Sequence, residues 1–291
     1  MAAAERVTVT QLQRWRDAGR PIAAITAYDA PTGRLCDEAG VDVVLVGDSL
    51  GNVVLGLPDT IGVTVPDMLR HTEAVARAVR RALVVADMPF LSYQTSAGQA
   101  VANAGALVRA GASAVKLEGG GGWSEAIRLM VQTGIPVMGH LGYTPQSIRR
   151  FGRPRVQGRD PREAADLVRE AETLQEAGVF AIVLEMVPSS VAAEVTRAVT
   201  VPTIGIGAGA GCSGQILVLH DVIGITEKPP RFVRSYGQVG RAIADAVSAY
   251  VLDVRAGVFP GPAETHYGHG WGQGQGGDED DDAGDGPRST A

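Results

Sequence analysis

Apolar runs recur eight times along the chain, and nearly every run ends in a polar or acidic residue. They read ITAYD (25–29), VVLVGDS (43–49), LVVADMP (83–89), AVKLEGG (114–120), PVMGHLG (136–142), AIVLEMVP (181–188), PTIGIGAG (202–209) and ILVLHD (216–221). Strands that are covered on both faces read as continuous apolar runs, whereas half-exposed strands alternate. The runs therefore predict the buried strands of a parallel sheet.

Segments of helical period lie between these runs. Five of them cover residues 66–81, 96–111, 123–134, 161–178 and 189–199. Most carry the end residues that helices favour, with proline or serine at the start and glycine at the close. In EAG-VDVVLV, RAG-ASAVKL and EAG-VFAIVL, a helix-ending glycine is followed directly by a strand. This order of elements indicates repeated β/α units.

The number of units predicts the fold class. About eight β/α units in about 250 residues match a TIM barrel. We predict an α/β fold, a (β/α)8 TIM barrel, with residues 1–262 as one catalytic domain; a doubly wound open sheet is the alternative. Barrel enzymes hold their chemistry at the C-terminal strand ends. The residues that fall there are Asp29, Asp48, Ser49, Asp87, Lys116, Glu118, His140, Glu185 and His220.

Charge is concentrated at the end of the chain. Residues 268–291 hold six acids and one base, so the remainder is close to neutral although the net charge is −6. No basic face is implied, and nucleic-acid binding has no support. The Gly- and Asp-rich segment 263–291 is predicted to be a disordered tail, because it cannot bury enough apolar surface to offset its ordering entropy.

The sequence favours an intracellular protein. It has no apolar stretch of about 18 residues or more, as a membrane span requires. The N-terminus lacks the pattern of a secretory signal. The two cysteines, Cys36 and Cys212, have neither metal-ligand nor disulfide-framework spacing.

Two long connections interrupt the pattern after the second and fifth strands, at residues 50–65 and 143–160. Both should lie on the catalytic side, where ordered loops of this length are usually lids or binding elements. The glycine-rich GIGAGAG (205–211) allows either close approach of a ligand or a tight turn.

Three carboxylates end neighbouring predicted strands: Asp48, Asp87 and Glu118. They would repel one another unless a cation or protons intervened, and oxygen ligands alone suit a hard ion such as Mg²⁺. Each could instead cap the helix that follows it. Their convergence favours the metal site.

Other strand ends supply candidate groups for acid–base chemistry. Lys116 lies two residues before Glu118, so both side chains point the same way, and a charged pair is less costly in the site than against an apolar helix layer. Lys116 could neutralise a substrate carboxylate, form a Schiff base or pair with Glu118. Glu185, across the barrel, could abstract a proton α to a polarised carbonyl. His140 could bind a substrate oxygen or be a core histidine.

Several stretches together resemble one enzyme family. ITAYD, VGDSLGNVVLG, TVPDMLRHTEAV, ADMPF, VKLEGG, GHLGYTPQS, LEMVP, IGIGAG and GQILVLHD occur in this order. They resemble ketopantoate hydroxymethyltransferase (3-methyl-2-oxobutanoate hydroxymethyltransferase), and the resemblance covers residues 5–262. VGDSLG with GHLGYTPQS and GIGAG…GQILV is a specific combination.

This resemblance implies a reaction and a set of roles. It implies transfer of a one-carbon unit from 5,10-methylenetetrahydrofolate to 3-methyl-2-oxobutanoate, giving 2-dehydropantoate for pantothenate biosynthesis. The barrel would be of the phosphoenolpyruvate/pyruvate type, in a cytoplasmic homo-oligomer, commonly a decamer, with small-molecule substrates and no membrane partner. The implied residues are Glu185 as proton acceptor, Asp48, Ser49, Asp87, Lys116 and His140 for the substrate, and Asp48, Asp87 and Glu118 for Mg²⁺.

Two other classes compete with this interpretation. A related Mg²⁺-dependent enzyme of phosphoenolpyruvate/pyruvate-type barrels, acting on a C–C or P–C bond, would share the aspartate metal site and a 2-oxo acid substrate. Those enzymes typically use a cysteine in a lid motif, and Cys36 lies in a helix-like segment instead. A non-catalytic barrel would have no use for the combined set of acids, Lys116 and Glu185.

Overall fold

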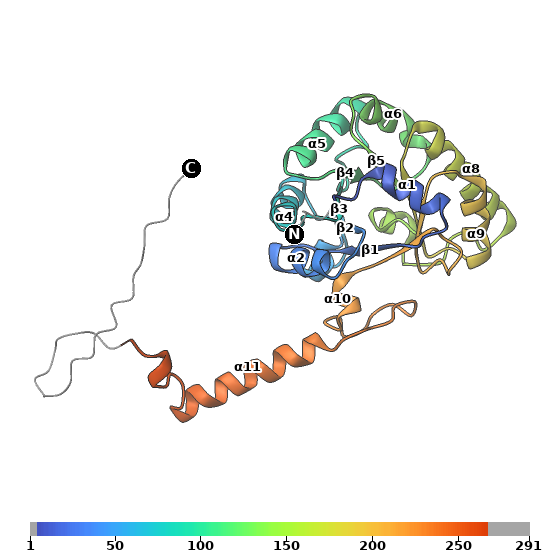
Figure 1. Ribbon diagram of the computed structural model, residues 1–291. Helices are drawn as coiled ribbons and strands as arrows, with labels where there is room; N and C mark the ends of the chain where they lie inside the picture. The colour runs from blue at the N-terminus through green and yellow to red at the C-terminus, as the bar shows by residue number, and fades with distance from the viewer. Residues whose placement is uncertain (1–4, 267–291) are drawn as a thin grey trace, which may run out of the picture. The chain divides into compact units, whose positions relative to one another are not determined.

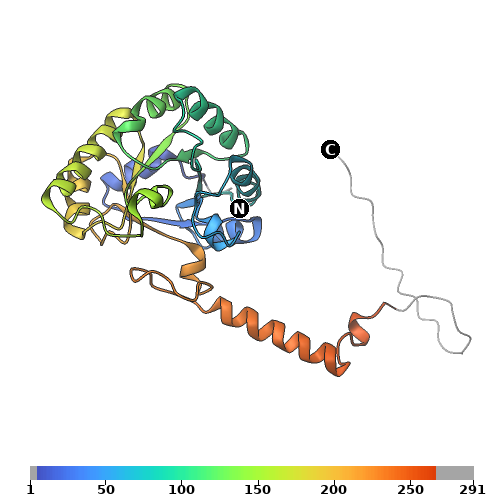
Figure 2. The same ribbon diagram turned by 180° about the vertical axis from the view of Figure 1, so that it is seen from behind.

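The computed structural model describes residues 5–266, and within them eight parallel strands close into a barrel surrounded by helices (Figures 1 and 2). The strands are β1 (Ile22–Thr26), β2 (Val43–Val46), β3 (Leu83–Asp87), β4 (Ala114–Lys116), β5 (Val137–Gly142), β6 (Ala181–Glu185), β7 (Thr203–Ile206) and β8 (Gly214–Leu217). Each strand pairs with the next along the chain, and β8 pairs with β1. The closed order confirms the predicted (β/α)8 TIM barrel and excludes the open sheet.

The predicted helical segments are confirmed, and further helices were not predicted. The helices are α1 (Val9–Asp17), α2 (Ala30–Glu38), α3 (Leu50–Val53), α4 (Val65–Ala78), α5 (Ala97–Arg109), α6 (Ser124–Gln132), α7 (Ile148–Phe151), α8 (Pro161–Ala177), α9 (Ser189–Ala198), α10 (Leu219–Val222) and α11 (Val239–Ala256). Short 3₁₀ turns are η1 (Gly121–Trp123), η2 (Pro145–Ser147) and η3 (Pro262–Glu264). Gly178 ends α8 in the left-handed conformation, as its position at the end of the predicted segment indicated. Thr64 starts α4 with a capping box, two residues before the predicted start at Pro66.

The chain divides into two compact units, residues 1–241 and 242–291, and the barrel lies in the first. The single domain reaching residue 262 stays a prediction. Residues 267–291, most of the predicted disordered tail, lie outside the described part of the chain. Among residues 5–266, no helix has the length and apolar character needed to cross a membrane.

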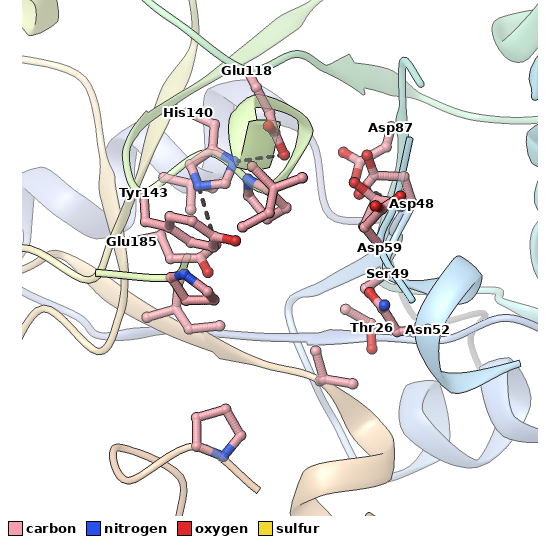
Figure 3. A pocket seen from close by; sticks show the side chains of 18 of the residues that line it. Thr26, Asp48, Ser49, Asn52, Asp59, Asp87, Glu118, His140, Tyr143 and Glu185 are labelled. Carbon is pink, nitrogen blue, oxygen red and sulfur yellow. Dashed lines mark hydrogen bonds and ion pairs between the residues drawn. The ribbon is translucent and has the colours of Figure 1, made fainter. Parts of the chain in front are cut away.

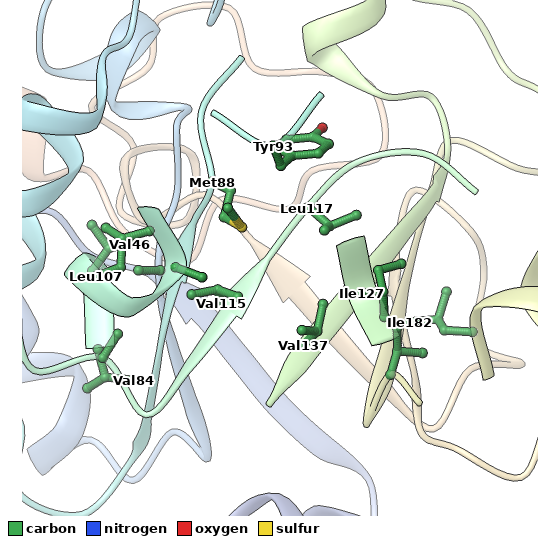
Figure 4. Close-up of a cluster of buried hydrophobic side chains, with 14 of the residues drawn as sticks. Val46, Val84, Met88, Tyr93, Leu107, Val115, Leu117, Ile127, Val137 and Ile182 are labelled. Atoms are coloured by element: carbon green, nitrogen blue, oxygen red, sulfur yellow. The ribbon is translucent and has the colours of Figure 1, made fainter. Parts of the chain in front are cut away.

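Successive strand side chains alternate between two buried clusters. One cluster draws residues from all eight strands, such as Val43 and Leu45 of β2, and fills the barrel interior. The other contains their neighbours Val44 and Val46 together with helix residues, and lies between strands and helices. Figure 4 shows part of this outer layer. Burial on both sides explains the continuous apolar runs, because neither face of a strand meets water.

An ion-pair cluster lies at the N-terminal end of β2, opposite the predicted catalytic end. Asp42 is buried, and its Oδ1 accepts hydrogen bonds from Arg20 Nη2 at 2.9 Å and from Arg81 Nη2 at 3.0 Å. Its Oδ2 accepts one from the backbone amide of Ala23, at 3.1 Å. The carboxylate thus ties the segment before β1 and the loop before β3 to the start of β2.

Replacing Asp42 by alanine is expected to lower the free energy of unfolding by about 2–4 kcal/mol, because two arginines and a backbone amide lose a buried charged acceptor. Urea unfolding followed by circular dichroism measures it. The control is Glu38→Ala, which breaks an exposed pair with Arg34 and is expected to cost under about 0.5 kcal/mol. Equal losses in the two variants would contradict a structural role for Asp42.

Candidate active site

A cavity of about 640 Å³ opens at the C-terminal ends of the strands, within the first unit. All of the predicted site residues line it: Asp48, Ser49, Asp87, Lys116, Glu118, His140 and Glu185. Figure 3 shows two groups that face each other, with Asp48, Asp87 and Ser49 on one side and His140, Tyr143 and Glu185 on the other. The predicted site residues therefore meet in one cavity.

Strand alternation explains why these side chains meet. Asp87, Lys116, His140 and Glu185 each lie two residues after an interior residue of their own strand. Because side chains repeat with period two along a strand, each points into the barrel at its open end. Asp48 and Ser49 follow β2 on the turn into α3.

Two aspartates and a lysine form one wall of the site. The backbone amide of Asp48 donates to Asp87 Oδ2 at 3.0 Å, and Lys116 Nζ lies 3.0 Å from Asp87 Oδ1. Burial raises the pKa of Asp48 well above its ordinary value, and the neighbouring Asp87 and Glu118 raise it further. Burial also raises the pKa of Asp87, against the opposing effect of Lys116. One lysine therefore does not compensate the buried acids.

Lys116 itself is held in the charged form. Burial alone would lower its pKa, but Asp87, Glu118 and Asp48 together raise it above the ordinary value. A Schiff-base lysine needs a free amine at working pH, which requires a lowered pKa. The charge environment therefore favours Lys116 as a fixed cation over Lys116 as a nucleophile.

His140 lies between two carboxylates, and its Nδ1 is also 3.2 Å from Lys116 Nζ. Its Nε2 is 3.2 Å from Glu185 Oε2, and its Nδ1 is 3.6 Å from Glu118 Oε1 (Figure 3). Burial and Lys116 lower the pKa of His140, but Glu118 and Glu185 raise it, to about 9 overall. Burial works to raise the pKa of Glu118, but His140 and Lys116 bring it below the ordinary value. His140 thus links Glu185 to Glu118, which follows β4.

Gln146, on the turn η2, was not predicted from the sequence. Its Nε2 donates to Asp48 Oδ2 at 2.8 Å and to the Met88 carbonyl at 3.0 Å. Its backbone amide donates to Glu118 Oε2 at 2.9 Å, and its Oε1 accepts from the Tyr93 hydroxyl, also at 2.9 Å. One buried residue, through its side chain and its backbone amide, thereby joins the carboxylates after β2 and β4. Its only sequence signal is membership of the GHLGYTPQS motif.

The two long connections both reach the cavity, as predicted. Asp59, from residues 50–65, and Arg149, from residues 143–160, line it and form an ion pair of 2.9 Å between Oδ2 and Nη2. The pair is exposed on the arginine side, so it contributes little stability. It joins the two connections over the site.

Two strand-end candidates have other positions. β1 ends at Thr26, so Asp29 lies beyond it and caps α2, where its Oδ1 accepts from the Thr32 amide at 2.7 Å. β8 ends at Leu217, and His220 lies in α10 with its ring 5.5 Å from that of Tyr28. Asp29 thus has the helix-capping role that was considered as the alternative for Asp48, Asp87 and Glu118.

The carboxylates of the site fit a metal ion only in part. Within residues 5–266, no group of three or more His, Cys, Asp and Glu side chains is arranged as a ligand cluster for a metal ion. Glu118 contacts His140 and Gln146 instead, so the three-carboxylate set stays a prediction. Asp48 and Asp87 do fit a hard cation, because they present buried oxygens whose negative charge Lys116 compensates only in part.

Comparison with known families gives a match that includes the whole barrel. The family model described as ketopantoate hydroxymethyltransferase matches residues 6–262. Similar curated relatives, named 3-methyl-2-oxobutanoate hydroxymethyltransferase, come from Pyrobaculum islandicum and Hyperthermus butylicus. The first is 57% identical and covers 85% of this chain and 94% of the relative; the second is 53% identical and covers 90% and 91%.

Solved structures with this fold are more distant in sequence. A phosphonopyruvate hydrolase in complex with oxalate and Mg²⁺ aligns with a TM-score of 0.57 at 16% identity, over 88% of this chain and 93% of its own. A 2,3-dimethylmalate lyase, described as a member of the PEP mutase/isocitrate lyase superfamily, aligns with a TM-score of 0.56 at 17% identity, over 89% and 91%. At this identity the likeness concerns the fold alone.

Proposed function

The chain belongs to the ketopantoate hydroxymethyltransferase family, and from this premise we propose that it converts 3-methyl-2-oxobutanoate to 2-dehydropantoate in pantothenate biosynthesis. The one-carbon donor is 5,10-methylenetetrahydrofolate. The keto acid loses its C3 proton and gains a CH2OH group, water supplies the hydroxyl oxygen, and the donor leaves as tetrahydrofolate. The observation that supports this best is a cavity in which a carboxylate, Glu185, faces Asp48 and Asp87, the second of which is paired with Lys116.

The keto acid is proposed to bind against the Asp48–Lys116 wall. It carries a carboxylate and a keto oxygen, both of which need positive or hydrogen-bonding partners. Lys116 supplies a buried fixed cation, and the Ser49 hydroxyl, 2.8 Å from the Tyr28 hydroxyl, supplies a donor that its neighbour holds in place. His140, with a raised pKa, supplies a further donor from the opposite wall.

Mg²⁺ is the proposed cofactor, with Asp48 and Asp87 as the protein ligands that fit it best and Glu118 as a further candidate. When bound there, the ion would polarise the keto group and make the C3 proton more acidic. Gln146 keeps the Asp48 carboxylate in a fixed orientation. Lys116 holds Asp87 from the other side, so both proposed ligands are positioned before any ion arrives.

Glu185 is the proposed base that accepts the C3 proton. Its carboxylate lies across the cavity from Asp48 and Asp87. His140 Nε2, at 3.2 Å from Glu185 Oε2, forms an ion pair with that carboxylate. General base catalysis of this kind contributes roughly 10²–10⁴-fold to a rate.

A cytoplasmic homo-oligomer, with the decamer as the expected size, is part of the same proposal. Helix α11 gives it support, because Ile243, Val247, Tyr250 and Val254 recur at the spacing of one helix face and all four are exposed. A second copy of the chain would cover such an apolar stripe. Each subunit of the oligomer would act on small-molecule substrates, and neither nucleic acid nor a membrane would be a partner.

The proposed reaction is tested with the purified protein, both substrates and MgCl2. We expect 2-dehydropantoate by mass spectrometry, loss of product on addition of excess EDTA, and recovery when Mg²⁺ is restored, because Asp48 and Asp87 are the proposed ligands. Circular dichroism provides the control that the chelated protein is still folded. A folded protein that forms no 2-dehydropantoate in this assay would rule the proposed function out.

A further inference from the structure

A second hollow, of about 520 Å³, opens beside Glu185 within the first unit. It shares Tyr143, Glu185 and Phe232 with the larger cavity, and Met186, Gly207 and Arg231 belong to it alone. The two spaces therefore meet at the proposed base. Its volume lies in the range of roughly 300–1,000 Å³ that is usual for sites of drug-sized ligands.

The wall of this hollow is held in an unusual backbone conformation. Met186 directly follows Glu185 and has a φ of 49°, in the left-handed region that non-glycine residues seldom occupy. Two hydrogen bonds hold it: its amide donates to the Ile206 carbonyl at 2.9 Å, and its carbonyl accepts from the Gln157 amide at 2.9 Å. Strained residues that are fixed in this way are concentrated at ligand sites.

Gly207 brings an aromatic ring against the backbone. It has a φ of 61°, and a Cβ at this position would lie 2.8 Å from Phe232 Cδ1. Only glycine therefore lets the Phe232 ring reach this depth. The sequence allowed two interpretations of this glycine-rich turn, close approach of a ligand or a tight turn. In the structure, its Gly207 makes room for an aromatic ring.

The chemistry of the walls selects one kind of ligand. Phe232 and Tyr143 present aromatic rings, which favour a flat conjugated group, and the lining is mostly apolar. The exposed Arg231 lies at the edge of the same hollow, where it suits an anionic tail. The keto acid has neither a ring nor a tail, and its proposed partners lie on the far side of Glu185.

Resting on the proposed function, we propose that this hollow binds the one-carbon donor. The pterin ring of the folate lies against Phe232 and Tyr143, and its negatively charged glutamate extends towards Arg231. This places the methylene carbon beside Glu185, where the C3 carbon of the keto acid loses its proton. The two substrates then meet at the shared wall, as formation of a C–C bond between them requires.

The test measures binding of tetrahydrofolate by isothermal titration calorimetry. We expect Phe232→Leu, which keeps apolar volume but removes the ring, to weaken tetrahydrofolate binding roughly fivefold or more. Gly207→Ala, which displaces the ring, is expected to act in the same direction. Arg231→Gln should weaken binding as well, whereas the control Arg234→Gln, exposed on the same segment, should not. In steady-state kinetics of Phe232→Leu, the ratio of the donor KM to the keto-acid KM should rise by the same factor.

The two proposals fail in different ways. If the wild-type protein forms no 2-dehydropantoate, the proposed function is wrong. If the wild type forms it and binds tetrahydrofolate, but Phe232→Leu and Arg231→Gln bind it with wild-type affinity, then only the assignment of this hollow is wrong. A rise in the keto-acid KM equal to that of the donor would also overturn the assignment.

Discussion

Replacing Glu185 by glutamine is expected to lower turnover by about 10²–10⁴-fold, the range that a general base contributes. Glutamine keeps the size of the side chain but cannot accept the C3 proton. Exchange of that proton with deuterated water, followed by NMR on 3-methyl-2-oxobutanoate, should fall with turnover, because it reports proton removal without the one-carbon donor.

Binding of the keto acid should survive this substitution. Of the proposed partners of its oxygens, Ser49, Asp48 and Asp87 lie on the other side of the cavity, and Lys116 is paired with Asp87. Calorimetry with the keto acid therefore separates a lost base from a lost site. The matched control is Glu194→Gln on the exposed face of α9, the helix that follows Glu185. Undiminished proton exchange in Glu185→Gln would remove Glu185 from the role of base.

The strand pattern was informative because burial and alternation act together. Runs such as VVLV and LVVAD are apolar throughout because one face meets the barrel interior and the other meets the helices. Asp87 ends such a run and lies two residues after the interior Val85. Because side chains two residues apart point to the same side of a strand, Asp87 points into the barrel. A polar residue at the end of a buried parallel strand therefore predicts where its side chain lies as well as what chemistry it can supply.

The rule that a polar residue after an apolar run marks the end of a strand is wrong for β8, because this strand does not begin with apolar residues. β8 begins at Gly214, where a Cβ would lie 2.4 Å from the Ile22 carbonyl oxygen, so close strand approach requires glycine. The apolar run starts two residues later, at Ile216. The strand end was therefore predicted near His220, whereas β8 ends at Leu217. The sequence contains no sign of this close contact, since it arises from the pairing of β8 with β1.

Gln146 and Phe232 were missed for a related reason. Both lie outside strands, on segments whose path depends on tertiary contacts. The role of Gln146 comes from contacts with residues 28 and 98 positions away, Glu118 and Asp48. No local pattern of hydrophobic and polar positions encodes such contacts. The charged residues at the strand ends were thus predictable from the sequence, whereas Gln146, which positions two of them, was not.

Replacing Asp48 by asparagine is expected to raise stability without Mg²⁺ and to abolish the response to Mg²⁺. Burial and Asp87 raise the pKa of Asp48 in the folded protein above the unfolded value of about 3.9. The unfolded state then holds fewer protons, so the free energy of unfolding of the wild type falls as pH rises from the unfolded towards the folded pKa. Asparagine does not titrate, so the variant does not lose free energy of unfolding in this way. Its side-chain oxygen can still accept the hydrogen bond from Gln146 Nε2.

Mg²⁺ should reverse the order of the two proteins. At about 100 times its Kd, a ligand that binds only the folded state adds about 2.7 kcal/mol, and we expect that gain in the wild type alone. Turnover of Asp48→Asn should fall about 100-fold or more, since a lost metal ion removes several kcal/mol of charge stabilisation. Thermal unfolding at pH 7, with and without MgCl2, measures the gain independently of activity.

Asp29→Asn is the matched control for this prediction, because Asp29 is also an aspartate near a strand end but caps α2, a position in which asparagine serves equally well. It should leave both the Mg²⁺ response and turnover within about twofold, since a cap-for-cap exchange costs only a few tenths of a kcal/mol. An unchanged Mg²⁺ response in Asp48→Asn would contradict Asp48 as a ligand. A lower stability of Asp48→Asn without Mg²⁺ would contradict the charge argument itself, because it would mean that the buried wall of Asp48, Asp87 and Lys116 is already balanced without a cation.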